Sequence, residues 1–284
     1  LKLGLKFEDT LGANPFKFGM IGSTDSHTSL ATAEEDNFFG KFPESEPSPE
    51  RVANGMAGYM WENWRIGASG YAGVWARENT REALFDAMRR REVYATTGSR
   101  ITVRFFGGWN YEESDLDKPD YIAAAYERGV PMGGNLQPTT SQKAPVFIVA
   151  AAKDPEGANL DRVQIIKGWL DSEGTLHEKV YDVAYSGDRE PDPSSGKLPD
   201  IGNTIDYEAA TFANSIGAAQ LSAVWRDPDF DPASRAVYYT RVIEIPTPRW
   251  PVYDARHFGF DLPEEVPKTN RDRAYTSPIW YTPQ

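Results

Sequence analysis

Two long β-type segments joined by a short turn constrain the fold of this chain more than any other feature. Asp161–Asp171 and Leu176–Ser186 are separated by a Ser172-Glu-Gly174 turn, which is short enough to make the two segments a hairpin. Apolar side chains occur on both faces of the first segment, with Val163 on one face and Ile166 on the other. The sequence therefore predicts an antiparallel sheet that is covered on both sides.

Further segments with a β pattern surround this hairpin in the region after Arg100. The chain contains 24 Gly and 21 Pro, many of them between these segments, which suits antiparallel layers rather than repeated βαβ units. We expect Trp225 and Trp250 to be at least half buried, because a wholly exposed indole wastes its large apolar area. The polar, proline-rich stretch 187–202 is expected to form a surface loop. The additional expected strands are 101–106, 144–152, 218–225 and 236–245.

The first hundred residues show a different pattern. Phe16–Ile21 alternates apolar with other residues and is followed by Gly22, which predicts a short strand that ends in a turn. A helix is expected to begin at Asn79 as its N-cap, with Glu82 completing a capping box. Arg89–Arg91 would close that helix, where positive charge complements the helix dipole.

The amino-acid composition limits the classes of molecule with which this chain is expected to interact. Lys and Arg total 30 against 42 Asp and Glu, a formal charge of −12, which disfavours nucleic acid as a partner. The longest apolar run, Val146 to Ala152, is far shorter than the roughly 20 residues of a membrane span. Cysteine is absent, which excludes disulfides and thiolate ligands. The acidic, cysteine-free composition is compatible with export and slightly favours a periplasmic or exported location over a cytoplasmic one.

The sharpest chemical signal is the run Gly22-Ser-Thr-Asp25-Ser-His27. Residues two apart in an extended segment point to the same side, so Asp25 and His27 can reach one metal ion. Imidazole together with carboxylate suits zinc, manganese or iron, although two ligands alone hold a metal weakly. The alternative is a turn aspartate beside a surface histidine.

This motif resembles the late Gly-Ser-Asp-x-His metal motif of the PHP superfamily, named for polymerase and histidinol phosphatase domains. The whole chain is similar to a bacterial PHP-like branch that is still labelled a domain of unknown function. The segments that carry the likeness beyond residue 27 are Glu34-Glu-Asp-Asn-Phe-Phe-Gly-Lys41, Ser69-Gly-Tyr-Ala-Gly-Val-Trp75, Tyr94-Ala-Thr-Thr-Gly-Ser-Arg100, Asp161-Arg-Val-Gln-Ile-Ile-Lys-Gly-Trp169, Ile245-Pro-Thr-Pro-Arg-Trp250 and Ser277-Pro-Ile-Trp280.

The resemblance implies a metal-dependent hydrolase on a distorted α/β barrel, with a cluster of two or three divalent metal ions. Asp25 and His27 would be metal ligands at the C-terminal end of a late barrel strand. Glu34 or Glu35, just after the motif, could act in catalysis by orienting a metal-bound water. An ordinary acidic loop is the competing interpretation of these two glutamates.

One part of the family pattern is missing. The His-x-His motif that opens a PHP domain cannot be formed, because His27, His177 and His257 lie far apart in the sequence. We therefore expect Leu1 to fall inside the catalytic domain and an upstream segment of the same parent protein to complete the site. The expected architecture is a barrel fragment over residues 1–100 followed by a mainly antiparallel β-rich layer over residues 101–284, mixed α+β overall.

Three arginines are candidates for binding an anionic substrate. Arg77, Arg81 and Arg100 each offer a guanidinium group, whose geometry matches phosphate. The resemblance implies a small-molecule ester, of which a phosphoester is the first expectation. Solvated or ion-paired surface arginine is the competing interpretation.

Other functions remain open at this stage. Tyr59, Trp61, Glu62 and Trp64 are aromatic residues beside a carboxylate, so the chain could be a non-catalytic β-rich module that binds glycans or a protein partner. A glycosidase would need two carboxyl groups facing each other across a cleft. A calcium loop at 227–231, with three aspartates, lacks the glycine and terminal glutamate of an EF-hand.

Overall fold

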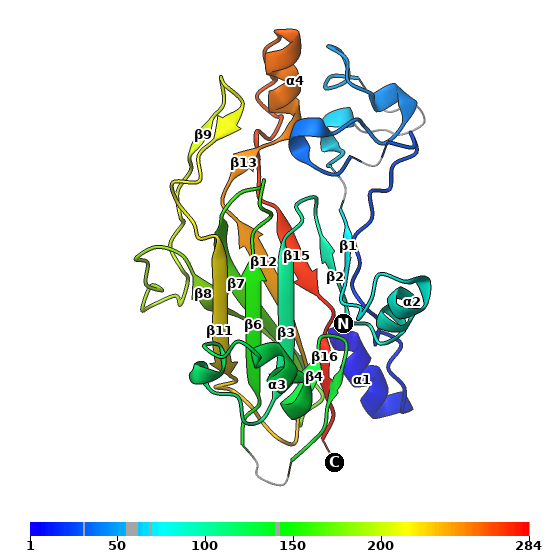
Figure 1. Cartoon of the computed structure of the whole chain (residues 1–284), viewed down its shortest axis with the longest axis vertical. Helices are drawn as coiled ribbons and strands as arrows, with labels where there is room; N and C mark the ends of the chain where they lie inside the picture. The colour runs from blue at the N-terminus through cyan, green and yellow to red at the C-terminus, as the bar shows by residue number, and fades with distance from the viewer. Residues whose placement is uncertain (31, 55–61, 69, 140–142, 284) are drawn as a thin grey trace.

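A computed structural model describes the chain apart from residues 31, 55–61, 69, 140–142 and 284. Two β-sheets face each other as a sandwich, and a set of loops and short helices lies over one end of it (Figure 1). We call this upper part the crown and define it as the described residues of 23–68 together with 247–270. The strands are β1 Ala72–Val74, β2 Val93–Thr96, β3 Thr102–Gly108, β4 Gly129–Pro131, β5 Asn135–Leu136, β6 Val146–Ala152, β7 Leu160–Leu170, β8 Leu176–Tyr185, β9 Ile205–Asp206, β10 Thr211–Phe212, β11 Gln220–Arg226, β12 Arg235–Glu244, β13 Thr247–Pro248, β14 Thr269–Asn270, β15 Arg273–Thr276 and β16 Ile279–Tyr281.

Helices are short and lie outside the sandwich. The α-helices are α1 Lys2–Leu11, α2 Arg81–Arg89, α3 Tyr121–Arg128 and α4 Trp250–Phe258, and the 3₁₀ helices are η1 Glu35–Asn37, η2 Pro43–Ser45, η3 Asn63–Arg65 and η4 Glu113–Asp115. None of the helices in the described residues is long and apolar enough to cross a membrane.

The larger sheet has eight strands and is organised around β12. Along its whole length β12 pairs with β7, which in turn pairs with β8. On its other side β12 pairs with β16 near its start and with β15 near its end, and β15 continues to β2 and β1. Apart from the two-residue parallel contact between β16 and β5, every pairing in this sheet is antiparallel.

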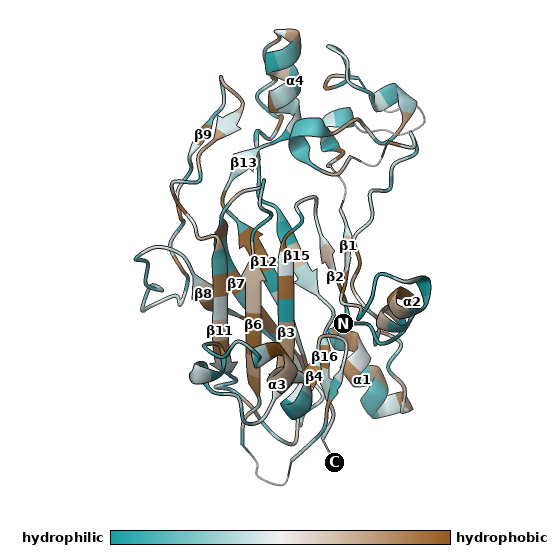
Figure 2. Ribbon diagram, in the orientation of Figure 1, coloured by the Kyte–Doolittle hydropathy of each residue, from teal (hydrophilic) through white to brown (hydrophobic). Residues whose placement is uncertain are grey.

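The smaller sheet has four strands in the order β11-β6-β3-β4 and is wholly antiparallel. Its central strand β6 has the sequence Val-Phe-Ile-Val-Ala-Ala-Ala and is apolar throughout, as Figure 2 shows. One face of β6 meets the other sheet and the opposite face meets α3, so both faces are buried. This double burial explains why the strand reads as an uninterrupted apolar run rather than an alternating one.

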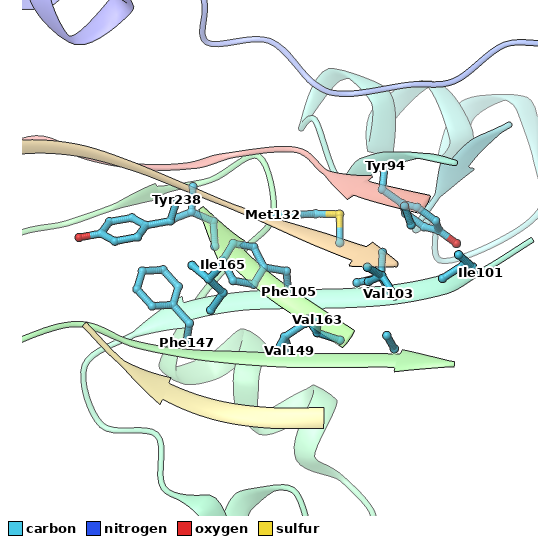
Figure 3. Close-up of a cluster of buried hydrophobic side chains, with 14 of the residues drawn as sticks. Tyr94, Ile101, Val103, Phe105, Met132, Phe147, Val149, Val163, Ile165 and Tyr238 are labelled. Carbon is cyan, nitrogen blue, oxygen red and sulfur yellow. The ribbon is translucent and has the colours of Figure 1, made fainter. Parts of the chain in front are cut away.

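The main hydrophobic core fills the space between the two sheets (Figure 3). Phe105 and Phe147 stack at 5.5 Å between ring centroids, and Phe147 also meets Tyr238 from the facing sheet at 4.5 Å. Val163 and Ile165 of β7 are fully buried in the same cluster. Burying such side chains contributes roughly 1.5–3 kcal/mol each, which makes this core the main source of stability.

The outer faces of the sheets are covered by helices. Leu5 of α1 packs with Leu170, Val237 and Trp280 on the back of the large sheet.

The predicted hairpin is confirmed by the antiparallel pairing of β7 with β8, and the expected burial of both faces of β7 is confirmed as well. Trp250 is 2% exposed and Trp225 is partly buried, as their large apolar area predicts.

The expectation of an α/β barrel fragment is wrong. The described strands form open antiparallel sheets, and they do not close into a barrel of parallel strands with a helix after each. Antiparallel pairing follows because strands are joined by hairpins and long loops rather than by crossover helices. Strand β2, from the first hundred residues, pairs with β15 near the C-terminus, so one sheet contains strands from both sides of residue 100.

Two local expectations in the first hundred residues also need correction. Phe16–Ile21 is not a strand: Phe16 lies in a turn, and Met20 N donates to the side chain of Ser277 rather than to a neighbouring strand. The predicted helix is α2, but its N-cap is Thr80, whose side chain accepts from Ala83 N at 3.3 Å, one residue later than expected.

At Gly22, directly after residues 16–21, the backbone comes very close to the sheet. Gly22 N donates to Tyr71 O at 3.2 Å, and Gly70 N donates to Ser23 O at 3.0 Å. A Cβ atom at Gly22 would lie 2.6 Å from the carbonyl oxygens of both Tyr71 and Thr96. Glycine is therefore required here for space, and this contact fixes the point from which the crown leaves the sandwich.

Candidate functional site

An acidic cavity of about 160 Å³ lies where the crown meets the end of the sandwich. Its walls come from η1 and α4 on the crown side and from the ends of β12 and β15 and the turn after β6 on the sandwich side. The carboxyl groups that line it are those of Glu34, Glu35, Asp36, Asp154, Glu156, Glu244 and Asp272. Few surfaces gather so many acids, because like charges that share a low-dielectric space repel one another.

Glu244 reaches this cavity from the interior of the sandwich. Residues two apart in a strand share a face, so Glu244 follows Tyr238 and Val242 on the inward side of β12. Its side chain is 1% exposed, and Ser99 Oγ donates to one of its oxygens at 2.5 Å. Burial, reinforced by the nearby charge of Asp272, raises the pKa of Glu244 to about 8.

Glu35 approaches the same cavity from the crown. Burial raises its pKa to about 7, and the charge of Asp272 adds to the effect. The backbone N–H of Trp250 donates to a Glu35 oxygen at 2.6 Å, which ties η1 to the start of α4 and partly offsets the rise. A carboxyl group with a pKa near 7 can give up or take up a proton under neutral conditions.

Asp272 and Asp154 line the cavity in different electrostatic surroundings. Burial raises the pKa of Asp272, although Thr97 Oγ1 donates to it at 2.6 Å. Burial also opposes ionisation of Asp154, but hydrogen bonds from the Arg100 and Glu156 backbone and from the Arg100 side chain lower its pKa overall. One cavity therefore holds both protonated and ionised carboxyl groups near neutral pH.

Arg100 lies at the rim of the cavity, close to the predicted catalytic residue Glu34. Its guanidinium contacts Asp154 at 3.1 Å, Glu156 at 3.1 Å and Glu34 at 3.4 Å. Three carboxylates thus surround the side chain that the sequence offers for anion binding. The structure brings Glu34 and Arg100 into contact and places Glu35 in the wall of the same cavity, whereas their roles stay predictions.

A larger hollow of about 710 Å³ adjoins the acidic cavity within the crown. The two spaces share Glu35, Asp36 and Tyr253 in their walls. In the wall of the larger hollow, Arg51 forms a buried ion pair with Asp254 and packs over the Trp250 ring at 4.5 Å. The shared walls place Glu35 between the acidic cavity, whose charged wall residues are all acids, and a hollow whose wall also contains Arg51 and Arg256.

Asp25 and His27 lie elsewhere in the crown, on an irregular exposed segment. Exposed and half-buried residues alternate along 23–28, and Asp25 and His27 are both exposed. Asp25 forms an ion pair with Lys41, and this hydrogen bond and charge hold the pKa of Asp25 below its usual value. His27 stacks on Phe42 at 4.5 Å between ring centroids.

The expected setting of this pair is wrong, whereas their role as metal ligands stays a prediction. No buried strand precedes them, and neither side chain lines either of the two spaces described above. Asp25 has a φ of 47°, in the left-handed region that L-residues other than asparagine and aspartate seldom adopt. Within the described parts of the chain, no group of three or more His, Cys, Asp or Glu side chains is arranged to hold a metal ion.

The remaining candidates are scattered. Arg77 and Arg81 are exposed in the loop before α2 and at its first residue, and they do not line the acidic cavity. Tyr59 and Trp61 lie outside the described residues. Trp64 packs in the crown core with Trp250, as an ordinary core aromatic would.

The 227–231 segment holds amino groups in place of a metal ion. Lys167 Nζ lies 2.7 Å from Asp227 Oδ2 and 2.6 Å from Asp229 O. Lys179 Nζ lies 2.6 Å from the Asp229 carboxylate. These ammonium groups already neutralise the carboxylates that a calcium ion would need.

Sequence reasoning found Glu34 and Glu35 but missed Asp154, Glu244 and Asp272. One signal was available, because the alternation of Tyr238, Thr240 and Val242 on β12 continues to Glu244 on the inward face. A glutamate that ends such an alternation is expected to be buried. Asp272 and Asp154 gave no comparable signal, since only the assembled sheets bring them to the same place.

Comparison with known proteins places the chain in a family without assigning an activity. No curated protein and no solved structure matches the chain. The family model described as "Protein of unknown function (DUF3604)" matches residues 1–283, which is nearly the whole chain. The chain therefore belongs to the DUF3604 family.

Proposed function

We propose that this chain forms part of a metal-dependent hydrolase of the phosphoesterase type that acts on a small-molecule ester. The observation that carries the proposal is that Asp25 and His27 lie two residues apart on one segment and are both exposed. The resemblance of Gly22–His27 to the PHP metal motif supports it.

The donor set fits one part of a metal centre. A carboxylate with a lowered pKa and an imidazole suit zinc, manganese or iron, and a bound divalent ion would supply an activated water and charge stabilisation. Lys41 now neutralises Asp25 and would have to move aside for a cation. Since the described residues add no third ligand, we propose that a segment upstream in the parent protein supplies the others.

Glu35 is a candidate proton carrier for such a reaction, although it lines the acidic cavity and Asp25 and His27 do not. It lies on the same crown segment as the Asp25-x-His27 motif, and its pKa of about 7 lets it exchange a proton at neutral pH. Glu34 lies beside it, with Arg100 as a neighbour. Arg100 could meet an anionic substrate only by leaving its carboxylate partners.

The test is hydrolysis of an aryl phosphate with added manganese or zinc. We expect negligible activity from the 284-residue chain alone and clear activity when the upstream segment is present. In the active form, Asp25→Asn and His27→Ala should each abolish the metal-dependent rate, whereas Arg89→Gln, on an exposed residue of α2, serves as the control. Activity of the longer form that survives both site substitutions would refute the proposal.

A second candidate is metal-independent acid–base hydrolysis in the acidic cavity, as in a glycosidase. The observation in its favour is that Glu35 and Glu244 share the cavity with Asp154, and that their surroundings push the pKa values in opposite directions. Hydrolysis of aryl glycosides that persists in EDTA and is lost in Glu35→Gln would favour this function. Glycan binding without any hydrolysis would instead favour a non-catalytic binding module.

A further inference from the structure

The junction between the crown and the sandwich opposes two groups of acids across one cavity. Glu34, Glu35 and Asp36 face it from the crown, whereas Asp154, Glu156, Glu244 and Asp272 face it from the sandwich. Ionised groups on both sides would repel one another and push the two parts apart.

Few cations are available to offset this repulsion. Arg100 is the ion-pair link across the rim, since it contacts Glu34 of the crown and Asp154 of the sandwich. Lys153 directs its ammonium to backbone oxygens of residues 154, 155 and 157, and Arg249 donates to Ile66 O. The charge of Lys153 favours ionisation of Glu244 and that of Arg249 favours ionisation of Glu35, but burial outweighs both and raises the two pKa values. Tyr253 is the remaining titratable wall residue, and burial raises its pKa to about 12, so it stays neutral.

Protonation of the buried acids therefore removes part of the repulsion between the two walls. We propose that this junction is a pH-sensitive closure: it is shut when Glu35 and Glu244 carry protons and loosens when both ionise. The two residues lie on opposite sides of the cavity, one on η1 and one at the end of β12. Ionisation adds charge to both walls at once, and the Arg100 link cannot balance it.

The direction of the pH effect follows from the raised pKa values of Glu35 and Glu244. Both carboxyl groups hold their protons well above the ordinary glutamate range, with pKa values of about 7 and about 8. Between pH 6 and pH 9 the cavity therefore gains negative charge on both walls. How tightly the crown packs against the sandwich does not depend on the proposed hydrolytic function.

Hydrogen exchange tests the proposal directly. Protection factors, corrected for the intrinsic pH dependence of exchange, would be measured at pH 6 and pH 9. We expect the amides of residues 34–38 and of α4 to lose about tenfold or more of their protection at pH 9, because one pK unit corresponds to a tenfold change in an equilibrium. Amides of β6 should keep theirs, since that strand lies inside the sandwich.

Variants separate the proposal from general alkaline instability. The double variant Glu35→Gln, Glu244→Gln should keep the crown protected at pH 9, whereas Glu173→Gln, in the exposed hairpin turn, should behave as wild type. If the double variant fails to fold, Arg100→Gln gives the second test: it removes the rim link and should loosen the crown at a lower pH. Wild-type protection that does not change with pH, or an Arg100→Gln chain that matches wild type, would overturn the proposal.

Discussion

The ammonium group of Lys167 lies 2.7 Å from the carboxylate of Asp227, and the two side chains are 2% and 0% exposed. Tyr238 donates its hydroxyl to the same carboxylate at 2.7 Å. Lys167 lies on the inward face of β7 beyond Val163 and Ile165, so this ion pair closes one end of the sandwich interior. Glu244 lies at the opposite end of β12, where the interior opens to the acidic cavity.

Replacing Lys167 with methionine should be strongly destabilising. The change leaves Asp227 as a buried charge without its ammonium partner, a situation that costs about 3–5 kcal/mol. Urea unfolding would measure the loss. Lys179→Met is the matched control, since that lysine is 52% exposed and its pair with Asp229 should be worth about 1 kcal/mol or less. Equal losses of unfolding free energy in the two variants would contradict the expectation that burial makes the Lys167–Asp227 pair costly to break.

The stability of the chain should fall between about pH 4.5 and pH 8. The folded state binds protons on Glu35 and Glu244 more tightly than the unfolded state, because their pKa values rise from 4.5 to about 7 and about 8. Their contribution is fully present below pH 4.5 and is lost as the pH passes the folded values. We expect a loss on the order of 2 kcal/mol per group in urea unfolding at pH 5 and pH 8.5. Glu244→Gln should flatten the profile, and an unchanged slope would count against the assignment.

Asp161 should anchor the 187–202 loop. This carboxylate is fully buried and contacts Arg162 and Arg271 at 3.1 Å and Arg189 at 2.7 Å. Asp161→Asn removes the charge that balances these arginines, so we expect a loss of about 3 kcal/mol and faster protease cleavage within the loop. Glu190→Gln, on an exposed acid of the same loop, is the control. Similar cleavage in both would show that Asp161 is not the anchor.

The left-handed backbone at Asp25 should appear as a difference between two substitutions. Asp25→Ala and Asp25→Gly both remove the ion pair with Lys41, but only glycine adopts a φ of 47° without steric cost. We expect the alanine variant to be about 1 kcal/mol less stable than the glycine variant in chemical denaturation. Variants of equal stability would mean that this segment relaxes when the side chain is lost.

The parts of the fold that could be predicted depend on short-range pattern. Val163 and Ile165 alternate with neighbours on the other face of β7, and a tight turn follows, so the hairpin was accessible from sequence. The barrel expectation failed because it depended on a resemblance rather than on a pattern of alternating strands and helices. Helix α1 was missed, although Leu1 and Leu5 are four residues apart and pack together under the large sheet.

Only part of the candidate site could be predicted from the sequence, for a related reason. Glu34 and Glu35 stand out beside a metal-type motif, but their partners Glu244 and Asp272 lie more than 200 residues further along the chain. Nothing in the sequence sets the distance between η1 and the end of β12. The raised pKa of Glu35 is likewise a property of the assembled cavity, since burial is its first cause.

The close backbone contact at Gly22 determines where this chain can be lengthened or spliced. With a Cβ position only 2.6 Å from two carbonyl oxygens, residues 19–23 cannot slide along β1 or accept an inserted residue without breaking the contacts with Tyr71 and Gly70. The exposed loop 187–202 has no such restriction along most of its length, and exposed loops are where foreign segments are best tolerated. A reporter peptide or a new terminus should therefore be accepted near Gly196, whereas the same insertion beside Gly22 should detach the crown from its support.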